Sequence, residues 1–234
     1  MWLTAPNINC VHGFSTRHGG VSKAPFDTLN LGGSEDSAEN INQNRVIALN
    51  ELGLNIDNLC NLKQVHSNKV NNAKIGQQEG DALVSNKKGL VLAISIADCY
   101  PILFYDEVSC VIGAAHAGWR GTVNRIAETT LKAMIELGAN PETTQVAIGQ
   151  GICQANFEVG AEVIKEFEEK GFPNDCWIKS RIDLVKCNRF VLEQIGITPK
   201  NIWTMNRCTH ENDFFSYRRD KGKTGRMWAV ISMQ

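Results

Sequence analysis

The stretch LVLAISIADCYPILFYDEVSCVIGAAHAGWRGT, residues 90–122, decides the fold class by its apolar runs and polar turns. Its first run, residues 90–97, is continuous and contains β-branched side chains, which is typical of a strand covered on both faces. Two further apolar runs, residues 102–105 and 110–115, flank the polar turn 106–109. This pattern predicts an antiparallel hairpin at the centre of a mixed α/β fold.

Helices and strands are predicted to alternate on both sides of this hairpin. The predicted helices span about 37–52, 122–137, 159–171 and 183–195, and the predicted strands span 82–85, 146–149 and 202–205. Asp36 or Ser37 is expected to cap the first helix, and residues 11–33 predict a loop with short strands. Because no repeat, low-complexity tract or linker interrupts the chain, we expect a single catalytic domain over residues 1–234.

The composition is that of an ordinary globular protein with almost no net charge. The 24 basic and 25 acidic residues give a net charge of -1, which removes any global attraction to nucleic acid or to an anionic membrane. None of the eight cysteines lies at C-x-x-C spacing, so zinc ribbons and thioredoxin-type motifs are excluded. The sequence contains no secretory signal and no run of roughly 18 apolar residues. We therefore expect a cytoplasmic protein with reduced thiols, either a monomer or a small homo-oligomer, with neither nucleic acid nor membrane as a partner.

The hairpin register predicts which side chains meet at its open end. If the turn is centred between Glu107 and Val108, the paired positions place Cys99 opposite His116. Directly opposed side chains of an antiparallel pair have Cβ atoms roughly 4.5–5.5 Å apart. Pro101 predicts a local distortion near this end of the hairpin. The sequence therefore predicts a thiol and an imidazole close together at a strand terminus.

A neighbouring thiol and imidazole support two kinds of chemistry. In a Cys–His dyad, the imidazole takes the thiol proton and Cys99 becomes a nucleophile. In a metal site, Cys99 and His116 need a third donor, and the segment Gln64-Val65-His66-Ser67 supplies His66. Three protein ligands with water in the fourth position are typical of catalytic zinc. The third alternative is a buried Cys and a hydrogen-bonded His that only pack, and spacing alone does not separate these interpretations.

Charged residues near this pair are candidates for orienting a ligand or binding an anion. Asp98 precedes Cys99 and, in a regular strand, points to the opposite face, where it would orient a ligand or fix the turn. Arg120 lies at a predicted helix start, where backbone N–H groups favour an anion, although a structural salt bridge fits it equally well. Arg219 belongs to the basic run Tyr217-Arg218-Arg219, which fits either phosphate binding or a solvated face.

Sequence blocks spread over nearly the whole chain carry a family resemblance. The most specific blocks are residues 97–101 (ADCYP) and 116–122 (HAGWRGT). The other matching blocks are 16–22 (TRHGGVS), 29–32 (LNLG), 44–45 (NR), 64–67 (QVHS), 80–84 (GDALV), 157–160 (FEVG), 214–220 (FFSYRRD) and 224–227 (TGRM). Through them the sequence resembles the YfiH-type family, long labelled laccase-domain or polyphenol oxidase proteins and understood as purine nucleoside phosphorylases. One departure is Gly149-Gln150-Gly151, where family members usually carry Gly-Pro.

The resemblance implies a fold, a metal and an activity. The implied fold is a single layered α/β/β/α domain with mixed sheets, distantly like the cytotoxic necrotizing factor deamidases. His66, Cys99 and His116 are the implied zinc ligands and catalytic residues, and we add Asp98 to them as a catalytic candidate. The implied reactions are phosphorolysis of adenosine, inosine, guanosine and methylthioadenosine to the base and a ribose 1-phosphate, and hydrolytic deamination of adenosine.

The implied chemistry makes two demands on the chain. Zinc lowers the pKa of a bound water to roughly 7, which serves attack on C6 of adenine in deamination. Phosphorolysis instead needs an anion site beside the ribose C1′. Since a guanidinium binds phosphate in a bidentate manner, we expect contacts to phosphate from among Arg17, Arg45, Arg120 and Arg219. The expected partners are therefore purine nucleosides and phosphate.

Three other functions are distinguishable alternatives. A copper polyphenol oxidase needs a blue-copper site and an imidazole-rich trinuclear cluster, and we reject it because the chain has five histidines and no H-x-H pair. A metal-free Cys–His hydrolase or amidase, acting in peptidoglycan precursor editing, would use Cys99 and His116, survive chelation and be lost on thiol alkylation. A binding module with structural zinc would need a fourth protein ligand.

Overall fold

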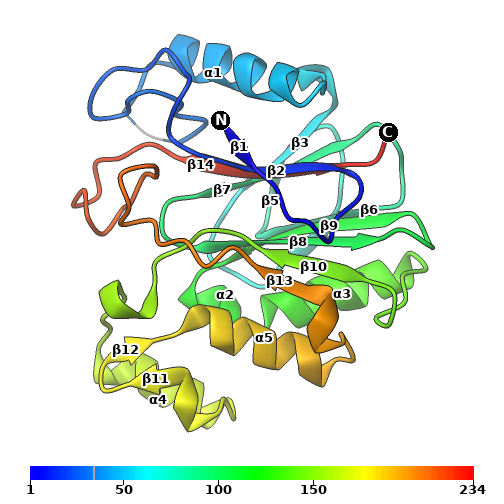
Figure 1. Cartoon of the computed structure of the whole chain (residues 1–234), viewed down its shortest axis with the longest axis vertical. Helices are drawn as coiled ribbons and strands as arrows, with labels where there is room; N and C mark the ends of the chain where they lie inside the picture. Colours follow the sequence, from blue (N-terminus) through cyan, green and yellow to red (C-terminus); the bar gives the residue numbers. More distant parts are fainter. Residues whose placement is uncertain (34) are drawn as a thin grey trace.

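Two six-stranded mixed sheets stacked face to face form the centre of the computed structural model, which describes residues 1–33 and 35–234 (Figure 1). The first sheet has the order β1 (Trp2–Leu3), β2 (Val11–Ser15), β14 (Met227–Ser232), β7 (Val91–Ile96), β3 (Leu59–Lys63) and β5 (Gly76–Glu79). The second has the order β13 (Ile202–Thr204), β10 (Gln145–Ile148), β8 (Tyr100–Asp106), β9 (Val111–Ala117), β6 (Ala82–Ser85) and β4 (Val70–Asn72).

Helices cover the outer faces of both sheets (Figure 1). One helix, α1 (Ala38–Glu51), lies over the first sheet, and three lie over the second: α2 (Trp119–Val123), α3 (Ile126–Glu136) and α5 (Leu184–Gln194). The peripheral elements are α4 (Ala161–Glu169), the ribbon of β11 (Trp177–Ile178) and β12 (Arg181–Ile182), and the 3-10 turns 56–58, 154–156, 174–176 and 199–201. The predicted α/β/β/α layering is confirmed.

Successive residues of one strand face different layers, as strand geometry requires. On β7, Leu92 and Ile94 face the interior between the two sheets, whereas Val91 and Ala93 face the layer beneath α1. Both sets are buried. The continuous apolar run 90–97 therefore belongs to a strand covered on both faces, and that prediction is confirmed.

Most of the predicted elements lie where the sequence places them. The helix predicted over 37–52 is α1, and the Ser37 hydroxyl caps it by accepting the Asn40 N–H at 3.1 Å. The strand predicted over 82–85 has the bounds of β6. The sequence did not predict β14, although it lies in the first sheet between β2 and β7 and pairs with both.

The helix predicted over 122–137 is wrong in its start and in its continuity. The chain turns helical earlier, at Trp119, and a second helix begins at Ile126. Asn124 closes the first helix, because its side chain donates to a carbonyl of that helix at 2.9 Å. Arg125 then adopts a left-handed backbone with φ of 60°, which redirects the chain.

The predicted register of the central hairpin is also wrong. Pro101, not Cys99, lies opposite His116, and the last pair before the turn is Asp106 with Val111. The turn thus contains four residues, 107–110, the last of which has a left-handed backbone. The buried Asp106 carboxylate accepts hydrogen bonds from two backbone N–H groups of this turn at 3.1 and 3.4 Å. These bonds stabilise the longer turn and shift the pairing.

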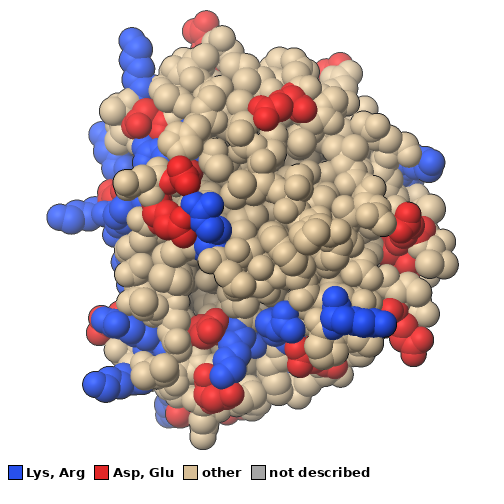
Figure 2. Space-filling view, viewed as in Figure 1, with Lys and Arg blue, Asp and Glu red and all other residues tan. Residues whose placement is uncertain are grey.

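Charged side chains of both signs share the surface. On the face drawn in Figure 2, Lys and Arg side chains lie next to Asp and Glu side chains along one edge of the molecule. Within the described ranges 1–33 and 35–234, no helix is long and apolar enough to span a membrane.

Candidate metal centre

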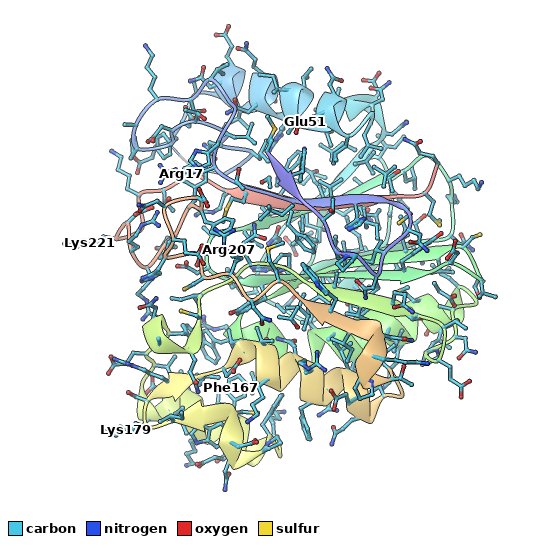
Figure 3. The ribbon with its side chains drawn as sticks, viewed as in Figure 1. Arg17, Glu51, Phe167, Lys179, Arg207 and Lys221 are labelled. Carbon is cyan, nitrogen blue, oxygen red and sulfur yellow. The ribbon has the colours of Figure 1, made fainter. Side chains whose placement is uncertain are left out.

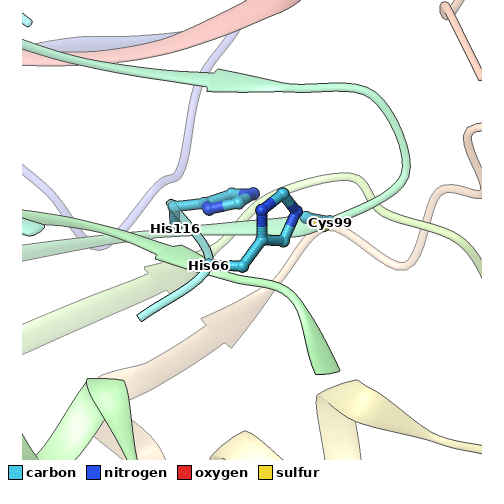
Figure 4. A group of neighbouring side chains, drawn as sticks. All are labelled: His66, Cys99 and His116. Atoms are coloured by element: carbon cyan, nitrogen blue, oxygen red, sulfur yellow. The ribbon is translucent and has the colours of Figure 1, made fainter. Parts of the chain in front are cut away.

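Three side chains from separate segments converge at one end of the second sheet (Figure 4). His66 follows β3, Cys99 immediately precedes β8, and His116 lies on β9. One donor atom from each lies within 4.8 Å of the others, and the two imidazole rings meet edge to face at a centroid distance of 4.9 Å. The structure therefore brings together the three residues that the sequence predicts as metal ligands.

Unusual backbone conformations place two of these side chains. His66 itself has φ of 58°, and Asp98, just before Cys99, has φ of 90°. Non-glycine residues rarely adopt such angles, and those that do cluster at functional sites. These bends explain why Cys99 reaches His116 although Pro101 takes the paired position.

A buried carboxylate, Asp81, holds the cluster together from behind. It accepts a hydrogen bond from His116 Nδ1 at 2.9 Å, from the His66 N–H at 3.0 Å and from both the N–H and the hydroxyl of Ser67 at 2.7 Å. Its bond to Nδ1 leaves Nε2 of His116 for Cys99 or a metal. The sequence analysis missed this role, although Asp81 opens the matching block 80–84 with Gly80 and directly precedes the strand that pairs with β9.

The cluster favours a charged thiolate. Burial alone would raise the pKa of Cys99, but the charge and hydrogen bond of His116, together with His66, lower it to about 6. Burial alone would lower the pKa of His116, but Cys99 and Asp81 raise it to about 9. Burial likewise opposes ionisation of Asp81, yet hydrogen bonds from His116 and Ser67 lower its pKa to about 2. Thiolate, imidazole and a supporting carboxylate form a donor set that suits a borderline-soft divalent ion.

The carboxylate of Asp98 is already engaged by the chain. One oxygen accepts the Thr209 hydroxyl at 2.6 Å and the other accepts the Arg218 N–H at 2.7 Å. The Asp98 carbonyl accepts the Ile152 N–H at 2.8 Å. Asp98 therefore links the start of β8, next to Cys99, to the C-terminal tail. This contact positions Cys99.

A cavity of about 670 Å³ opens onto the cluster. Sites for small ligands commonly enclose roughly 300–1,000 Å³, so a nucleoside is of suitable size. Strands of both sheets and the C-terminal tail contribute to it. Its lining comprises Gly32, Gly33, Arg45, Asn61, Leu62, Lys63, Gln64, His66, Gln77, Ser95, Ala97, Asp98, Cys99, His116, Ile152, Phe157, Tyr217, Arg218 and Arg226.

Of the four arginines expected to contact phosphate, Arg45 lines the cavity and the other three do not. Arg17 pairs with Asp27 at 3.1 Å and stacks on an aromatic ring; Figure 3 labels it. Arg219 donates to three backbone carbonyls and to its neighbouring carboxylate. Arg120 is exposed and lies over the ring of Trp119 at 4.4 Å.

Comparison with known proteins identifies the family. A family model described as multi-copper polyphenol oxidoreductase laccase matches residues 11–234. The chain belongs to this family. This laccase-type chain is 45% identical over 237 residues to a purine nucleoside phosphorylase of Deinococcus radiodurans, covering 99% of the chain and 92% of that relative. It is 34% identical over 250 residues to an adenosine deaminase from an unknown prokaryotic organism, and the match covers 97% of the chain and 95% of that relative.

A solved structure supports the same assignment at the level of the fold. The crystal structure of the hypothetical protein YfiH from Bacillus licheniformis matches this laccase-type chain with a TM-score of 0.90 and 29% sequence identity. The match covers 95% of this chain and 92% of the other. The resemblance to YfiH-type proteins, stated from the sequence, is thereby confirmed.

Glycine at position 118 gives the cluster its space in this laccase-type chain. A Cβ added there would lie 2.8 Å from the Cys99 sulfur and 3.4 Å from Cδ2 of His66. We expect Gly118→Ala to displace both side chains and to lower the affinity of the cluster for a divalent metal ion about tenfold, since small displacements of positioned groups are costly. Gly138→Ala is the control for destabilisation alone. Gly138 lies at a helix end with φ of 104°, which strains an alanine, but no atom lies near the position that a Cβ would occupy. Equal metal affinity in the two variants, measured by competition with a chromophoric chelator at equal stability, would contradict the prediction.

Proposed function

We propose that the chain is a zinc-dependent purine nucleoside phosphorylase that also deaminates adenosine. The substrates are adenosine, inosine, guanosine and methylthioadenosine, and phosphorolysis yields the base and a ribose 1-phosphate. The observation that carries the proposal is the convergence of His66, Cys99 and His116 at the wall of a nucleoside-sized cavity. The names of the relatives, purine nucleoside phosphorylase and adenosine deaminase, point to the same chemistry.

The donor set fits zinc better than the copper in the family's description. His66, Cys99 and His116 are the three proposed ligands, and within the described residues they are the group with metal-ligand geometry. A multicopper centre needs an imidazole-rich trinuclear cluster besides a blue-copper site, which one group of two imidazoles and one thiolate does not supply, whereas three protein ligands with an open fourth position are typical of catalytic zinc. When bound, zinc supplies Lewis-acid polarisation and a water of lowered pKa.

Residues of the chain orient the proposed ligand His116 and form the wall of the cavity. Asp81 fixes the His116 tautomer through Nδ1. Gln64 is held in place on β7, because its amide exchanges two hydrogen bonds of 2.8 Å with the backbone of Ser95. Phe157 and Tyr217 offer aromatic surface to a flat purine base. Because both sheets contribute to this cavity, we propose that residues 1–234 act as one catalytic domain.

Removal of the metal tests the proposal. We expect a chelator such as dipicolinate to lower both phosphorolysis and deamination at least about 100-fold, because an ion that stabilises transition-state charge contributes several kcal/mol. One equivalent of zinc should restore both activities. The assay incubates protein with adenosine and phosphate and resolves adenine, inosine and hypoxanthine. A metal-loaded protein that forms none of these products overturns the proposed function.

A metal-free Cys–His hydrolase or amidase is the second candidate, with peptidoglycan precursors as its substrate class. It is favoured by one observation, the approach of Cys99 and His116 donor atoms to within 4.8 Å of each other, with the imidazole hydrogen-bonded to Asp81 at 2.9 Å. In this case amide hydrolysis would survive chelation and disappear on alkylation of Cys99. His66 would then be dispensable, which gives the two candidates opposite expectations for a His66 variant.

A further inference from the structure

Two half-buried arginines line the cavity without a carboxylate partner among the described residues. Arg45 extends from α1, and Arg226 immediately precedes β14; both are half-buried. Neither takes part in an ion pair within ranges 1–33 and 35–234. Burial lowers the pKa of both guanidinium groups. A partly buried cation without a counter-charge is costly, so an anionic ligand at this place relieves that cost.

Both arginine residues are hydrogen-bonded to the backbone of the same residue, Leu31. Arg45 Nε donates to the Leu31 carbonyl at 2.8 Å, and the Leu31 N–H donates to the Arg226 carbonyl at 2.9 Å. Arg226 Nη1 also donates to the carbonyls of Thr224 and Gly225 at 2.9 and 3.0 Å. These bonds fix the two side chains. In the described part of the chain they leave both terminal nitrogens of Arg45, and Nε and Nη2 of Arg226, without an acceptor.

Space and a further donor lie beside the Arg45 guanidinium. At Gly32, the position that a Cβ would occupy is 3.5 Å from Arg45 Nη2 and 3.5 Å from the Ser95 hydroxyl oxygen. That hydroxyl accepts Trp228 Nε1 at 3.0 Å, so its own proton is available to a ligand. Because position 32 carries no side chain, two donors face a common gap in the cavity wall.

The gap opens into the same cavity as the metal cluster. Arg45, Arg226 and Ser95 line this cavity together with Cys99 and His116. An anion bound between Arg45 and Arg226 would therefore occupy the same cavity as a substrate that reaches the cluster. In a phosphorylase, phosphate has to sit beside the nucleoside in this way.

We propose that Arg45, Arg226 and the Ser95 hydroxyl form the subsite that holds inorganic phosphate for phosphorolysis. The inference rests on the proposed function and assigns its phosphate contacts. In the reaction, a phosphate oxygen bonds to ribose C1′ as the bond from C1′ to purine N9 breaks. The electron pair of that bond leaves with the purine, and the proton of hydrogen phosphate ends on the purine. Guanidinium groups hold the attacking oxyanion in bidentate contacts.

The other cations of the cavity are less suited to this role. Lys63 pairs with Glu79 at 3.6 Å. Arg218 is exposed, donates to the Glu158 carbonyl at 3.0 Å and stacks over Phe157. Solvent compensates the charges of these two exposed side chains. Arg45 and Arg226 also lie over aromatic rings, of Trp228 and Tyr217, but they are half-buried.

The test compares Arg45→Gln and Arg226→Gln with Arg181→Gln, an exposed arginine outside the cavity. Initial rates of adenosine phosphorolysis and deamination are measured against phosphate concentration, with thermal unfolding as the check on folding. We expect each cavity variant to raise the phosphate KM about tenfold or more, and to lower the ratio of phosphorolysis to deamination by a similar factor. Arg181→Gln should keep the wild-type ratio. Arg45→Lys and Arg226→Lys, which retain charge but lose bidentate contact, should give smaller shifts.

Phosphate titration followed by phosphorus-31 NMR provides a readout independent of turnover. Weaker phosphate binding in Arg226→Gln than in Arg181→Gln is expected. An unchanged phosphate KM in both cavity variants, or a parallel fall of both activities, overturns the subsite. If the wild-type protein forms no product from any purine nucleoside, the proposed function fails instead, and the NMR titration alone decides whether the anion site exists.

Discussion

Replacement of His66, Cys99 or His116 by alanine is expected to reduce nucleoside turnover at least about 1,000-fold while the protein stays folded. Each side chain supplies one donor of the proposed metal site, and two donors are a poor zinc site. A loss of this size corresponds to about 4 kcal/mol of transition-state stabilisation, within the range that a metal ion contributes. His66 is exposed, so its removal should leave the core undisturbed.

Zinc content by mass spectrometry, circular dichroism and the rates of both reactions are the measurements for these variants. Cys110→Ser is the matched control, because Cys110 is an exposed thiol at the far end of the same hairpin. It should retain zinc and full turnover. The His66→Ala variant separates the two candidate functions, since a Cys–His dyad keeps both of its members. Full activity in His66→Ala would contradict zinc catalysis and favour the hydrolase.

The sequence predicted the meeting of Cys99 and His116 from a register that turned out to be wrong. A local pattern shows that two apolar runs form a hairpin, but not that the turn takes four residues. That length depends on Asp106, whose carboxylate also accepts the Asn140 N–H at 2.7 Å and the Thr143 hydroxyl at 2.9 Å. These partners follow α3, far along the chain. The bent backbone at Asp98 then compensated for the shifted pairing.

Other features of the site depend on contacts that no local pattern contains. The local pattern located α1 and β6, but it did not give the packed face of α1, which buries Asn44, Ala48 and Leu49 and leaves Val46 exposed. The central strand β14 lies at the C-terminal end of the chain, and its partners β2 and β7 are distant in sequence. Among the arginines, the motifs gave candidates but could not show that Asp27 already pairs with Arg17, or that Arg226 faces the cavity.

Asp81→Asn is expected to lower zinc affinity about 10- to 100-fold and to destabilise the fold by about 3 kcal/mol. The carboxylate is fully buried and accepts five hydrogen bonds, from His116 Nδ1, three successive N–H groups and a hydroxyl. An amide of the same shape would turn an N–H group toward these donors and leave buried polar atoms unpaired. His116 would also lose the acceptor that fixes its tautomer, and loss of such a partner typically costs 10- to 100-fold in metal affinity.

Asp106→Asn is the control that separates these two effects. Asp106 is likewise fully buried and accepts hydrogen bonds from backbone N–H groups, but it lies at the opposite end of the hairpin. Both variants should lose stability in urea unfolding, by comparable amounts. Only Asp81→Asn should lose zinc affinity in competition with a chromophoric chelator. If Asp106→Asn weakens zinc equally, the loss reflects general destabilisation, and Asp81 does not act by orienting His116.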